Sequence, residues 1–180
     1  MHKDSKYQQK EHITSIDVYT DGSYKKRSNG SLYGCGYGIY FPGKELKNIA
    51  APFTKGNITN NRAELYAIYR AIVRITKKYT FDLVNIYTDS EYSQKSLTEW
   101  INAWKINGWK NSKKQPVENQ DIIKKIDRYL QHYHGKINIQ WVKSHAKGDQ
   151  VHIHSAGNKK ADALANKGSD KYAALYGTQA

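Results

Sequence analysis

Cysteine and long apolar runs are what this 180-residue chain most lacks. Its one cysteine, Cys35, cannot form a disulfide within the chain, and the cysteine pairs of a structural zinc site are missing. No run approaches the roughly 20 apolar residues that span a bilayer, and residues 1–11 are too polar for a secretory signal. We therefore expect an intracellular protein, cytoplasmic or nuclear, with no membrane partner.

Acidic residues are also scarce relative to basic ones. The chain has 29 Lys and Arg residues against 16 Asp and Glu residues, which gives a formal net charge of +13. A field of that sign concentrates polyanions at the protein surface. Solubility alone and attraction to an anionic membrane are alternative explanations, but the charge balance favours nucleic acid as the partner.

No repeat, low-complexity tract or Pro/Gly-rich linker divides the chain. Its length suits one domain, and we expect a monomer. The first and last segments lack a clear pattern, so flexible tails are expected at 1–14 and 169–180 around a folded unit at 15–168.

The apolar pattern predicts a mixed α/β domain. Strands are expected at 16–24, 33–41 and 44–53, with a turn at 25–30, and their short connections predict a meander. Leu65, Ile68, Ile72 and Ile75 then recur at helical spacing, beside a stripe of alanines that would let this helix lie close to a sheet. Further helices are expected at 90–104, 119–132 and 158–167, and further strands at 83–88 and 137–142. This order predicts a mixed sheet with helices packed on its faces.

Four acidic residues lie in or at the ends of these elements, and they are Asp21, Glu64, Asp89 and Asp162. Taken singly, they could be a hairpin turn, a capping box with Asn61, a helix cap shared with Ser90, and a solvated helical charge. Taken together, they suit phosphodiester hydrolysis, in which two hard cations about 4 Å apart activate a water and stabilise the leaving oxygen. Mg²⁺ takes oxygen ligands and keeps several waters, so a few carboxylates suffice.

Five short segments stand out along the chain: Tyr19–Ser23 (YTDGS), Thr59–Leu65 (TNNRAEL), Tyr87–Tyr92 (YTDSEY), Trp141–Ala146 (WVKSHA) and Gly157–Asp162 (GNKKAD). In this order they resemble type 1 ribonuclease H, over nearly the whole chain from about residue 16 to 167. Each motif is weak alone, but the five in order are highly specific. The resemblance implies an α/β, ribonuclease H-like fold with a five-stranded mixed sheet. This sheet would hold a three-stranded antiparallel meander and two parallel strands, with helices on both faces.

The resemblance also implies an activity, namely endonucleolytic cleavage of RNA paired to DNA, leaving a 3′-hydroxyl and a 5′-phosphate. It implies two Mg²⁺ ions, with Mn²⁺ as a substitute, and makes Asp21, Glu64, Asp89 and Asp162 the metal ligands. Asp21 would bridge both ions, Glu64 and Asp89 would hold the ion on the leaving-group side, and Asp162 the ion that activates water. Glu64 would also contact the 2′-hydroxyl that distinguishes RNA from DNA.

His145 corresponds to a catalytic histidine that the family keeps on a mobile loop, where it assists the water or product release. A surface histidine in a polar loop is the alternative. The segment 145–157 is longer than in most relatives and also holds His152 and His154. Which of the three histidines reaches the active site stays open, as does a transition-metal site or a long flexible flap.

The stretch 93–119 resembles the family's basic protrusion, which binds the DNA strand of the hybrid. Its expected substrate-binding residues are Trp100, Trp104, Lys105, Trp109, Lys110, Lys113 and Lys114. Trp100 and Trp104 are four residues apart and therefore share a helix face; burial in the core is the alternative for these indoles. Other expected substrate contacts are Thr59, Asn60, Asn61, Asn119 and Asn158, and helix capping is a compatible alternative for those at helix starts.

Glu91 departs from the family pattern, because many relatives have an uncharged residue there that contacts the RNA. A fifth carboxylate could repel phosphate, so we expect it to weaken hybrid binding. Two other functions remain open from the sequence: a hybrid-binding module that does not cut, and another nuclease of the same fold, such as a transposase or junction resolvase.

Overall fold

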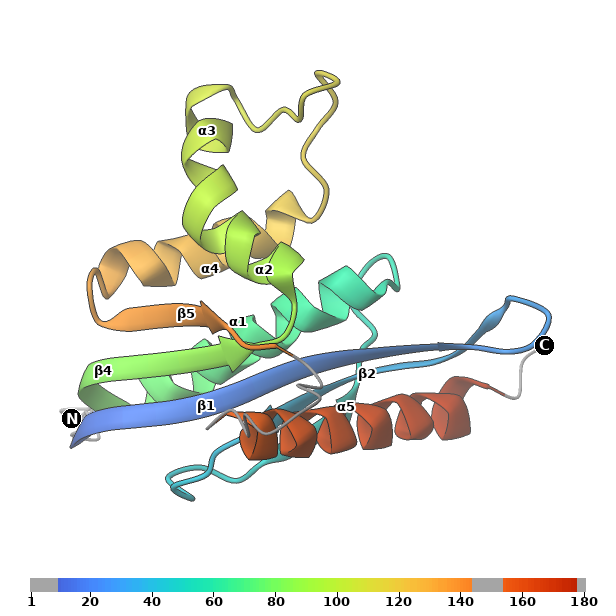
Figure 1. Ribbon diagram of the computed structural model, residues 1–180, viewed down its shortest axis with the longest axis horizontal. Coiled ribbons are helices and arrows are strands. Elements are labelled where there is room, and N and C mark those ends of the chain that lie inside the picture. Colours follow the sequence, from blue (N-terminus) through green and yellow to red (C-terminus); the bar gives the residue numbers. More distant parts are fainter. Residues whose placement is uncertain (1–9, 144–153, 178–180) are drawn as a thin grey trace, which may run out of the picture.

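The computed structural model describes residues 10–143 and 154–177, and a five-stranded sheet forms its centre (Figure 1). The strands are β1 (Glu11–Lys26), β2 (Leu32–Tyr40), β3 (Ile49–Pro52), β4 (Tyr79–Thr88) and β5 (Ile137–Trp141), in the spatial order β3-β2-β1-β4-β5. β1, β2 and β3 pair antiparallel, whereas β4 lies parallel to β1 and β5 parallel to β4. The predicted antiparallel meander with two added parallel strands is therefore confirmed.

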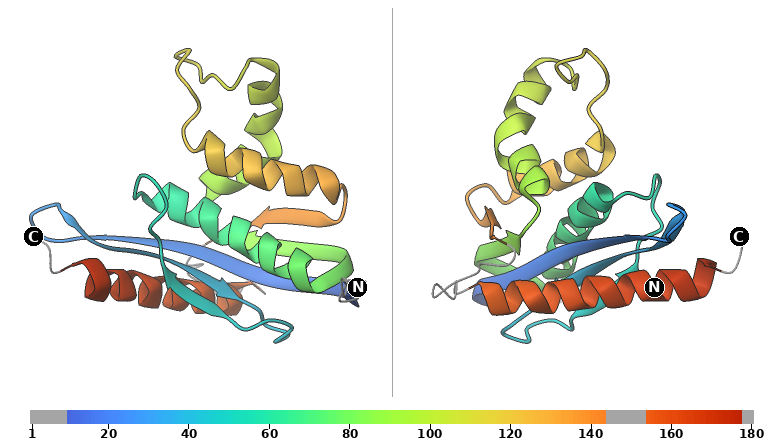
Figure 2. Two further views of the ribbon diagram at one scale, coloured as in Figure 1. Left: turned by 180° about the vertical axis from the view of Figure 1, so that it is seen from behind. Right: turned by 45° about the vertical axis from the view of Figure 1, so that its right-hand side comes forward.

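Helices cover both faces of this sheet, as predicted (Figures 1 and 2). They are α1 (Asn60–Lys78), α2 (Glu91–Lys95), the π-helical turn η1 (Ser96–Trp100), α3 (Ile101–Ile106), α4 (Gln120–His132) and α5 (Ser155–Tyr176). α5 packs on β1, β2 and β3 from one side, while α1 packs on β1 and β2 from the other and carries α4 on its outer flank. α2, η1 and α3 rise away from the sheet as a protrusion. None of the described helices is long and apolar enough to cross a membrane.

Small residues let the two large helices lie against the sheet. Ala63, Ala67 and Ala71 are fully buried along α1, which confirms the predicted alanine stripe. On the other face, alternate glycines of β2 leave room for α5, since a Cβ at Gly36 would lie 2.1 Å from the backbone nitrogen of Ser169. This close approach sets the distance between α5 and the face of the sheet, which includes the strand that carries Asp21.

Several boundaries differ from those predicted. β1 begins at Glu11 and α5 continues to Tyr176, so the expectation of flexible tails is wrong for residues 11–14 and 169–176. β1 also extends to Lys26 into the predicted turn, and β3 is restricted to Ile49–Pro52 within the longer strand predicted there. The added length of β1 is explained by β4, which begins at Tyr79 and pairs with β1 from Glu11 onward.

Candidate active site

Asp21 lies in the middle of β1 and its side chain is buried. It pairs with Gly38 of β2, and β1 continues beyond it to Lys26, so the hairpin-turn alternative is wrong. The next residue, Gly22, faces the start of α1, where a Cβ would lie only 2.7 Å from the backbone nitrogen of Glu64. The missing side chain therefore lets α1 touch the strand and brings Glu64 beside Asp21.

Glu64 lies in the second turn of α1 and is 4% exposed. Thr59 caps this helix, because its hydroxyl accepts a hydrogen bond from the Arg62 amide at 3.3 Å. The alternative of a capping box formed by Asn61 and Glu64 is therefore wrong, since the helix begins two residues earlier than that box requires. The Oε2 atom of Glu64 is buried and has no hydrogen-bond partner among the described residues. A buried carboxylate oxygen without a partner is costly unless another group, such as a cation, compensates it.

Asp89 follows the last residue of β4, and Thr20 pairs with Thr88 just before the two aspartates. Ser90 caps α2 through a 3.2 Å hydrogen bond from the Ser93 amide, which leaves the Asp89 carboxylate free of that role. Asn158 of α5 donates a hydrogen bond from Nδ2 to Asp89 Oδ2 at 3.1 Å. One oxygen from each of Asp21, Glu64 and Asp89 lies within 4.8 Å of the other two.

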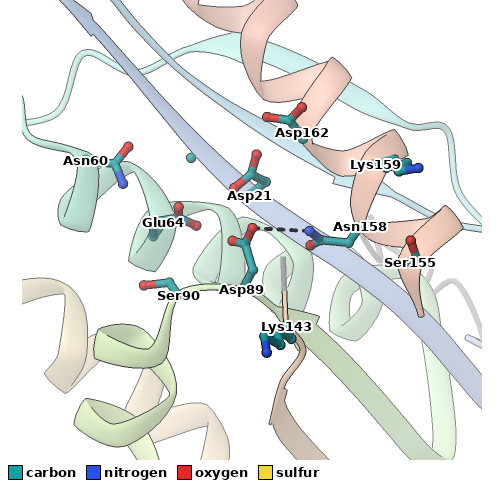
Figure 3. A pocket seen from close by; sticks show the side chains of 11 residues that line it. Asp21, Asn60, Glu64, Asp89, Ser90, Lys143, Ser155, Asn158, Lys159 and Asp162 are labelled. Carbon is teal, nitrogen blue, oxygen red and sulfur yellow. Dashed lines mark hydrogen bonds between the residues drawn. The ribbon is translucent and has the colours of Figure 1, made fainter. Parts of the chain in front are cut away.

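Asp162 approaches the same place from the opposite face of the sheet, on the exposed side of α5. The amide of Asn166 donates a 2.9 Å hydrogen bond to its Oδ1 atom. Figure 3 shows the four carboxylates around one pocket of about 310 Å³. Its lining residues are Asp21, Gly22, Asn60, Glu64, Asp89, Ser90, Lys143, Ser155, Asn158, Lys159 and Asp162. The four predicted acids, far apart in the sequence, thus converge.

The close approach of these carboxyl groups makes their ionisation unfavourable. Burial, followed by the negative charges of Asp89 and Asp162, raises the pKa of Asp21 to about 8. Burial and the neighbouring Asp21 charge likewise hold the pKa of Glu64 well above its usual range. Ionising all these groups together requires nearby positive charge. Clustered hard oxygen donors, one of them without a partner, match the ligand preference of a divalent cation such as Mg²⁺ or Mn²⁺, and the residues therefore fit divalent metal.

His145 and His152 lie outside the described residues, so the structure does not place them. His154 is described; it is the N-cap residue of α5, makes no side-chain capping hydrogen bond, and does not line the pocket of the carboxylates. Its Nδ1 lies 2.9 Å from the Tyr19 hydroxyl, and its ring packs on Tyr87 with centroids 4.1 Å apart. Both tyrosines belong to motifs that stand out in the sequence, but no role was predicted for either. The signal was available for Tyr19, since it lies two positions before Asp21 and therefore on the same face of β1. Lys143, Ser155 and Lys159 also line the pocket, although none of them was predicted as a site residue.

The predicted substrate contacts near α1 are only partly gathered at the pocket. Asn60 lines it, whereas Thr59 and Asn61 are exposed beside it at the start of the helix. Asn119 has left-handed backbone with φ of 61° and does not cap α4 with its side chain. Instead it accepts a 3.3 Å hydrogen bond from Arg62 and donates one of 2.9 Å to the Tyr92 hydroxyl. These contacts tie α1 to the base of the protrusion.

The protrusion holds its aromatic rings in a row. The ring centroids of Trp100 and Trp104 are 5.9 Å apart, and those of Trp104 and Trp109 are 6.3 Å apart. Trp100 is 39% exposed, so it is only partly a core residue. Lys105 forms a 2.6 Å ion pair with Asp127 of α4, which fixes the protrusion to the domain. Lys110, Lys113 and Lys114 are exposed on the connection to α4.

The protein is a basic α/β domain with four carboxylates in one pocket, and a protrusion beside it bears lysines and indoles. This fold and this site define the class of metal-dependent nucleic-acid hydrolases. Comparison with known proteins is more specific. The family model for RNase H matches residues 13–170. The chain therefore belongs to the RNase H family.

Individual relatives agree with this assignment. The chain is 38% identical over 156 residues to the Ribonuclease H of Methylobacillus flagellatus, covering 87% of this chain and 92% of that protein. Among solved structures, it is similar to the foamy viral protease-reverse transcriptase in complex with RNA/DNA hybrid, with a TM-score of 0.70, 30% identity, and coverage of 87% of this chain and 20% of that one. The PFV RNase H domain matches with a TM-score of 0.68 and 31% identity, covering 87% of this chain and 94% of that domain.

Proposed function

We propose that this chain is a ribonuclease H that cuts the RNA strand of RNA–DNA hybrids internally, leaving 3′-hydroxyl and 5′-phosphate ends. The observation that carries the proposal is the approach of Asp21, Glu64 and Asp89 oxygens to within 4.8 Å of one another, with Asp162 lining the same pocket. We also propose that it acts as a monomer, because the fold of one chain brings all four carboxylates into the pocket and a second copy is not needed to complete it. Family membership and the basic surface support a nucleic-acid substrate.

Two Mg²⁺ ions, replaceable by Mn²⁺, are the proposed cofactors. Asp21 would hold both ions, Glu64 and Asp89 the one on the leaving-group side, and Asp162 the other. When bound, such ions supply an activated water and stabilise the negative charge that develops on the leaving oxygen.

The remaining pocket residues have positioning and binding roles in this proposal. Asn158 orients Asp89 through its amide hydrogen bond, as outer partners of metal ligands commonly do. Lys143 and Lys159 bring positive charge to the pocket rim, where they can bind a phosphate of the RNA strand. Glu64 would contact the 2′-hydroxyl beside the cut, and His145 would assist the water or product release.

Binding of the hybrid is assigned to the protrusion and to the start of α1. The protrusion, at 93–119, would bind the DNA backbone through its indoles and lysines, without reading sequence. The residues proposed for this contact are Trp100, Trp104, Lys105, Trp109, Lys110, Lys113 and Lys114, joined by Thr59, Asn60, Asn61, Asn119 and Asn158. Lys105 would contribute weakly, because Asp127 already neutralises it. No feature of the described residues favours a non-cleaving module or a junction resolvase.

The test is a cleavage assay on an RNA–DNA hybrid, an RNA duplex and a DNA duplex, with Mg²⁺ and with EDTA. The wild-type protein should cut the hybrid alone, and only with metal. Asp21→Asn should lose this activity, because it removes a carboxylate from the metal cluster. Asp17→Asn, an exposed acid four residues earlier on β1, is the matched control and should retain activity. Cutting of the DNA duplex but not the hybrid would overturn the proposal.

A further inference from the structure

A second pocket lies away from the carboxylates, at the end of α1 and the start of β1. Its lining residues are Lys10, Glu11, Leu46, Arg70, Val73, Arg74, Lys77 and Lys78, and its volume is about 730 Å³. We call it the α1 groove. It shares no residue with the active-site pocket, which has a volume of about 310 Å³.

Positive charge in the α1 groove is poorly compensated. Five of its lining residues are Lys or Arg and one, Glu11, is acidic. Across the described chain, no carboxylate lies within ion-pair distance of these five cations. Arg70 and Arg74 are four residues apart on α1, as are Arg74 and Lys78, and like charges at this spacing destabilise a helix. The helix therefore carries an electrostatic cost that a bound anion would remove.

The helix dipole does not explain all of this charge. Lys77 and Lys78 lie in the last turn of α1, where the dipole favours cations. Arg70 and Arg74 precede that turn, so this explanation does not reach them. Arg70 is half-buried, and its Nε has no hydrogen-bond partner among the described residues. The protein itself therefore compensates the Arg70 guanidinium only partly, which adds to the uncompensated charge of the groove.

The chemistry of the groove indicates which anion fits. Guanidinium groups bind phosphate oxygens in a bidentate manner, and two of them occur here on adjacent helical turns. The volume greatly exceeds that of one phosphate, which suits a chain of phosphates. The exposed large hydrophobic residues, which would favour a lipid surface, all lie elsewhere, and they are Tyr33, Trp100, Ile106, Trp141, Leu175 and Tyr176.

We propose that the α1 groove binds the phosphodiester backbone of a nucleic-acid segment remote from the cut, as a second contact for long substrates. This inference rests on the proposed function, because it extends the same substrate beyond the active site. Glu11 at the groove and Asp21 at the active site are ten residues apart on β1, and an extended strand of that length spans roughly 33 Å. A duplex covers that distance in about ten base pairs at ~3.4 Å each.

Substrate length therefore tests the groove. A hybrid of about 8 base pairs spans roughly 27 Å and cannot reach from one site to the other even when bound by one end. A hybrid of about 24 base pairs can, and so can a short hybrid with a long single-stranded tail on either strand. Fluorescence anisotropy in EDTA measures the affinity for each labelled substrate without cleavage, over a range of salt concentrations.

The test variant is Arg70→Gln with Arg74→Gln, and the matched control is Lys167→Gln with Lys171→Gln, a cation pair of the same spacing on α5. The groove variant should bind the long hybrid or a tailed substrate at least about fivefold more weakly, with a salt slope lower by about 1 to 2, as loss of two phosphate contacts predicts. Its affinity for the short hybrid and its kcat with Mg²⁺ should not change. The tailed substrates identify whether duplex or single strand supplies the backbone.

A charge-preserving variant, Arg70→Lys with Arg74→Lys, guards against a folding defect and should show an intermediate loss, because lysine cannot bind phosphate in a bidentate manner. Equal losses on short and long substrates, no loss on long ones, or the same loss in the control pair would each overturn the proposal. So would groove-dependent binding to phosphatidylserine vesicles with unchanged nucleic-acid binding. Failure of the wild type to cut the short hybrid would instead count against the proposed function.

Discussion

The carboxyl groups of Asp21 and Glu64 are shielded from water and surrounded by other acids, so the metal-free protein holds protons there that the unfolded chain releases. The pKa of Asp21 is raised from 3.8 to about 8 in the folded protein. At a pH between these two values, Asp21 takes up a proton when the chain folds. This uptake stabilises the folded protein near pH 4, and the stabilisation is lost as the pH rises toward 8. One such proton corresponds to up to about 1.4 kcal/mol of unfolding free energy per pH unit.

We therefore expect the free energy of unfolding, measured with urea in EDTA, to fall as the pH is raised from 4 to 8. Asp21→Asn should flatten this decline, because its amide carries no proton to lose. Asp17→Asn should behave like the wild type. Added Mg²⁺ should restore stability at pH 8, since the ion binds the folded state alone. Metal-free stability that rises across this window would contradict the expectation.

Glu91 is exposed and forms a 2.7 Å ion pair with Lys95 one helical turn later. Substituting Glu91→Gln removes a negative charge near the pocket and frees Lys95 for the substrate. We expect hybrid binding to tighten, by about twofold to fivefold, in line with the small energies of exposed charges. Anisotropy in EDTA at low salt measures this change, with Glu99→Gln on the same protrusion as control. Unchanged or weaker binding would show that Glu91 does not repel the hybrid.

At the scale of single residues, the sequence was most informative about the acids. Asp21, Glu64, Asp89 and Asp162 could be identified because chemistry restricts which residues suit a divalent metal. Caps were less predictable, since Thr59, Asn60 and Asn61 are all suitable at a helix start and the structure has Thr59 as the cap. The role of His145 stays a prediction, because it lies outside the described residues.

Among the elements, α5 has the most influence on the site, because it carries both Asn158 and Asp162. Its first turn rests on a pair of stacked rings, Tyr19 and Tyr87, whose centroids are 4.8 Å apart. His154 hydrogen-bonds to the first and packs on the second, and Gly157 contacts the Tyr19 ring so closely that a Cβ would lie 2.3 Å from it. The rings thus set where α5 begins and hence where Asn158 meets Asp89.

We expect His154→Ala to weaken the response to Mg²⁺ indirectly, because His154 is a positioning residue. The Mg²⁺ concentration for half-maximal activity should rise by about threefold to tenfold, near the lower range for partners that orient metal ligands. KM for the hybrid at saturating Mg²⁺ should not change, because His154 lies outside the pocket. Tyr19→Phe, which keeps the ring and removes the hydroxyl, should show the same effect in a milder form. A loss of kcat that excess Mg²⁺ cannot restore would indicate direct participation in catalysis.

Element type and order could be predicted from the sequence, whereas element length could not. The helical spacing of Leu65, Ile68 and Ile72 predicted α1, and these residues are buried in the core. α5 extends beyond its predicted end because its outer half is stabilised by contact with the glycines of β2, a tertiary effect that periodicity does not record. β3 is short for a related reason, since only residues 49–52 of the strand predicted at 44–53 pair with β2.

On the scale of the whole molecule, a net charge of +13 surrounds a pocket of four carboxylates. The composition predicted a polyanionic partner but not its binding site, because the number of charged residues does not say where they lie on the folded surface. The fold separates the cations into the exposed lysines of the protrusion and the α1 groove, on different elements. Long-range attraction from both should speed encounter with nucleic acid and weaken steeply with salt.

The protrusion lysines should therefore control affinity rather than chemistry. Replacing Lys110, Lys113 and Lys114 together by Gln should lower the salt slope of hybrid binding by about 2 to 3, because each lost phosphate contact removes about 0.9. KM should rise at moderate salt while kcat at saturating hybrid should not change, since none of the three lines the active-site pocket. Unlike loss of the groove arginines, this loss should appear on hybrids of about 8 base pairs as well as long ones, because α2, at the base of the protrusion, begins two residues after Asp89. An effect confined to long hybrids would instead indicate that these lysines contact the hybrid only at a distance from the cut.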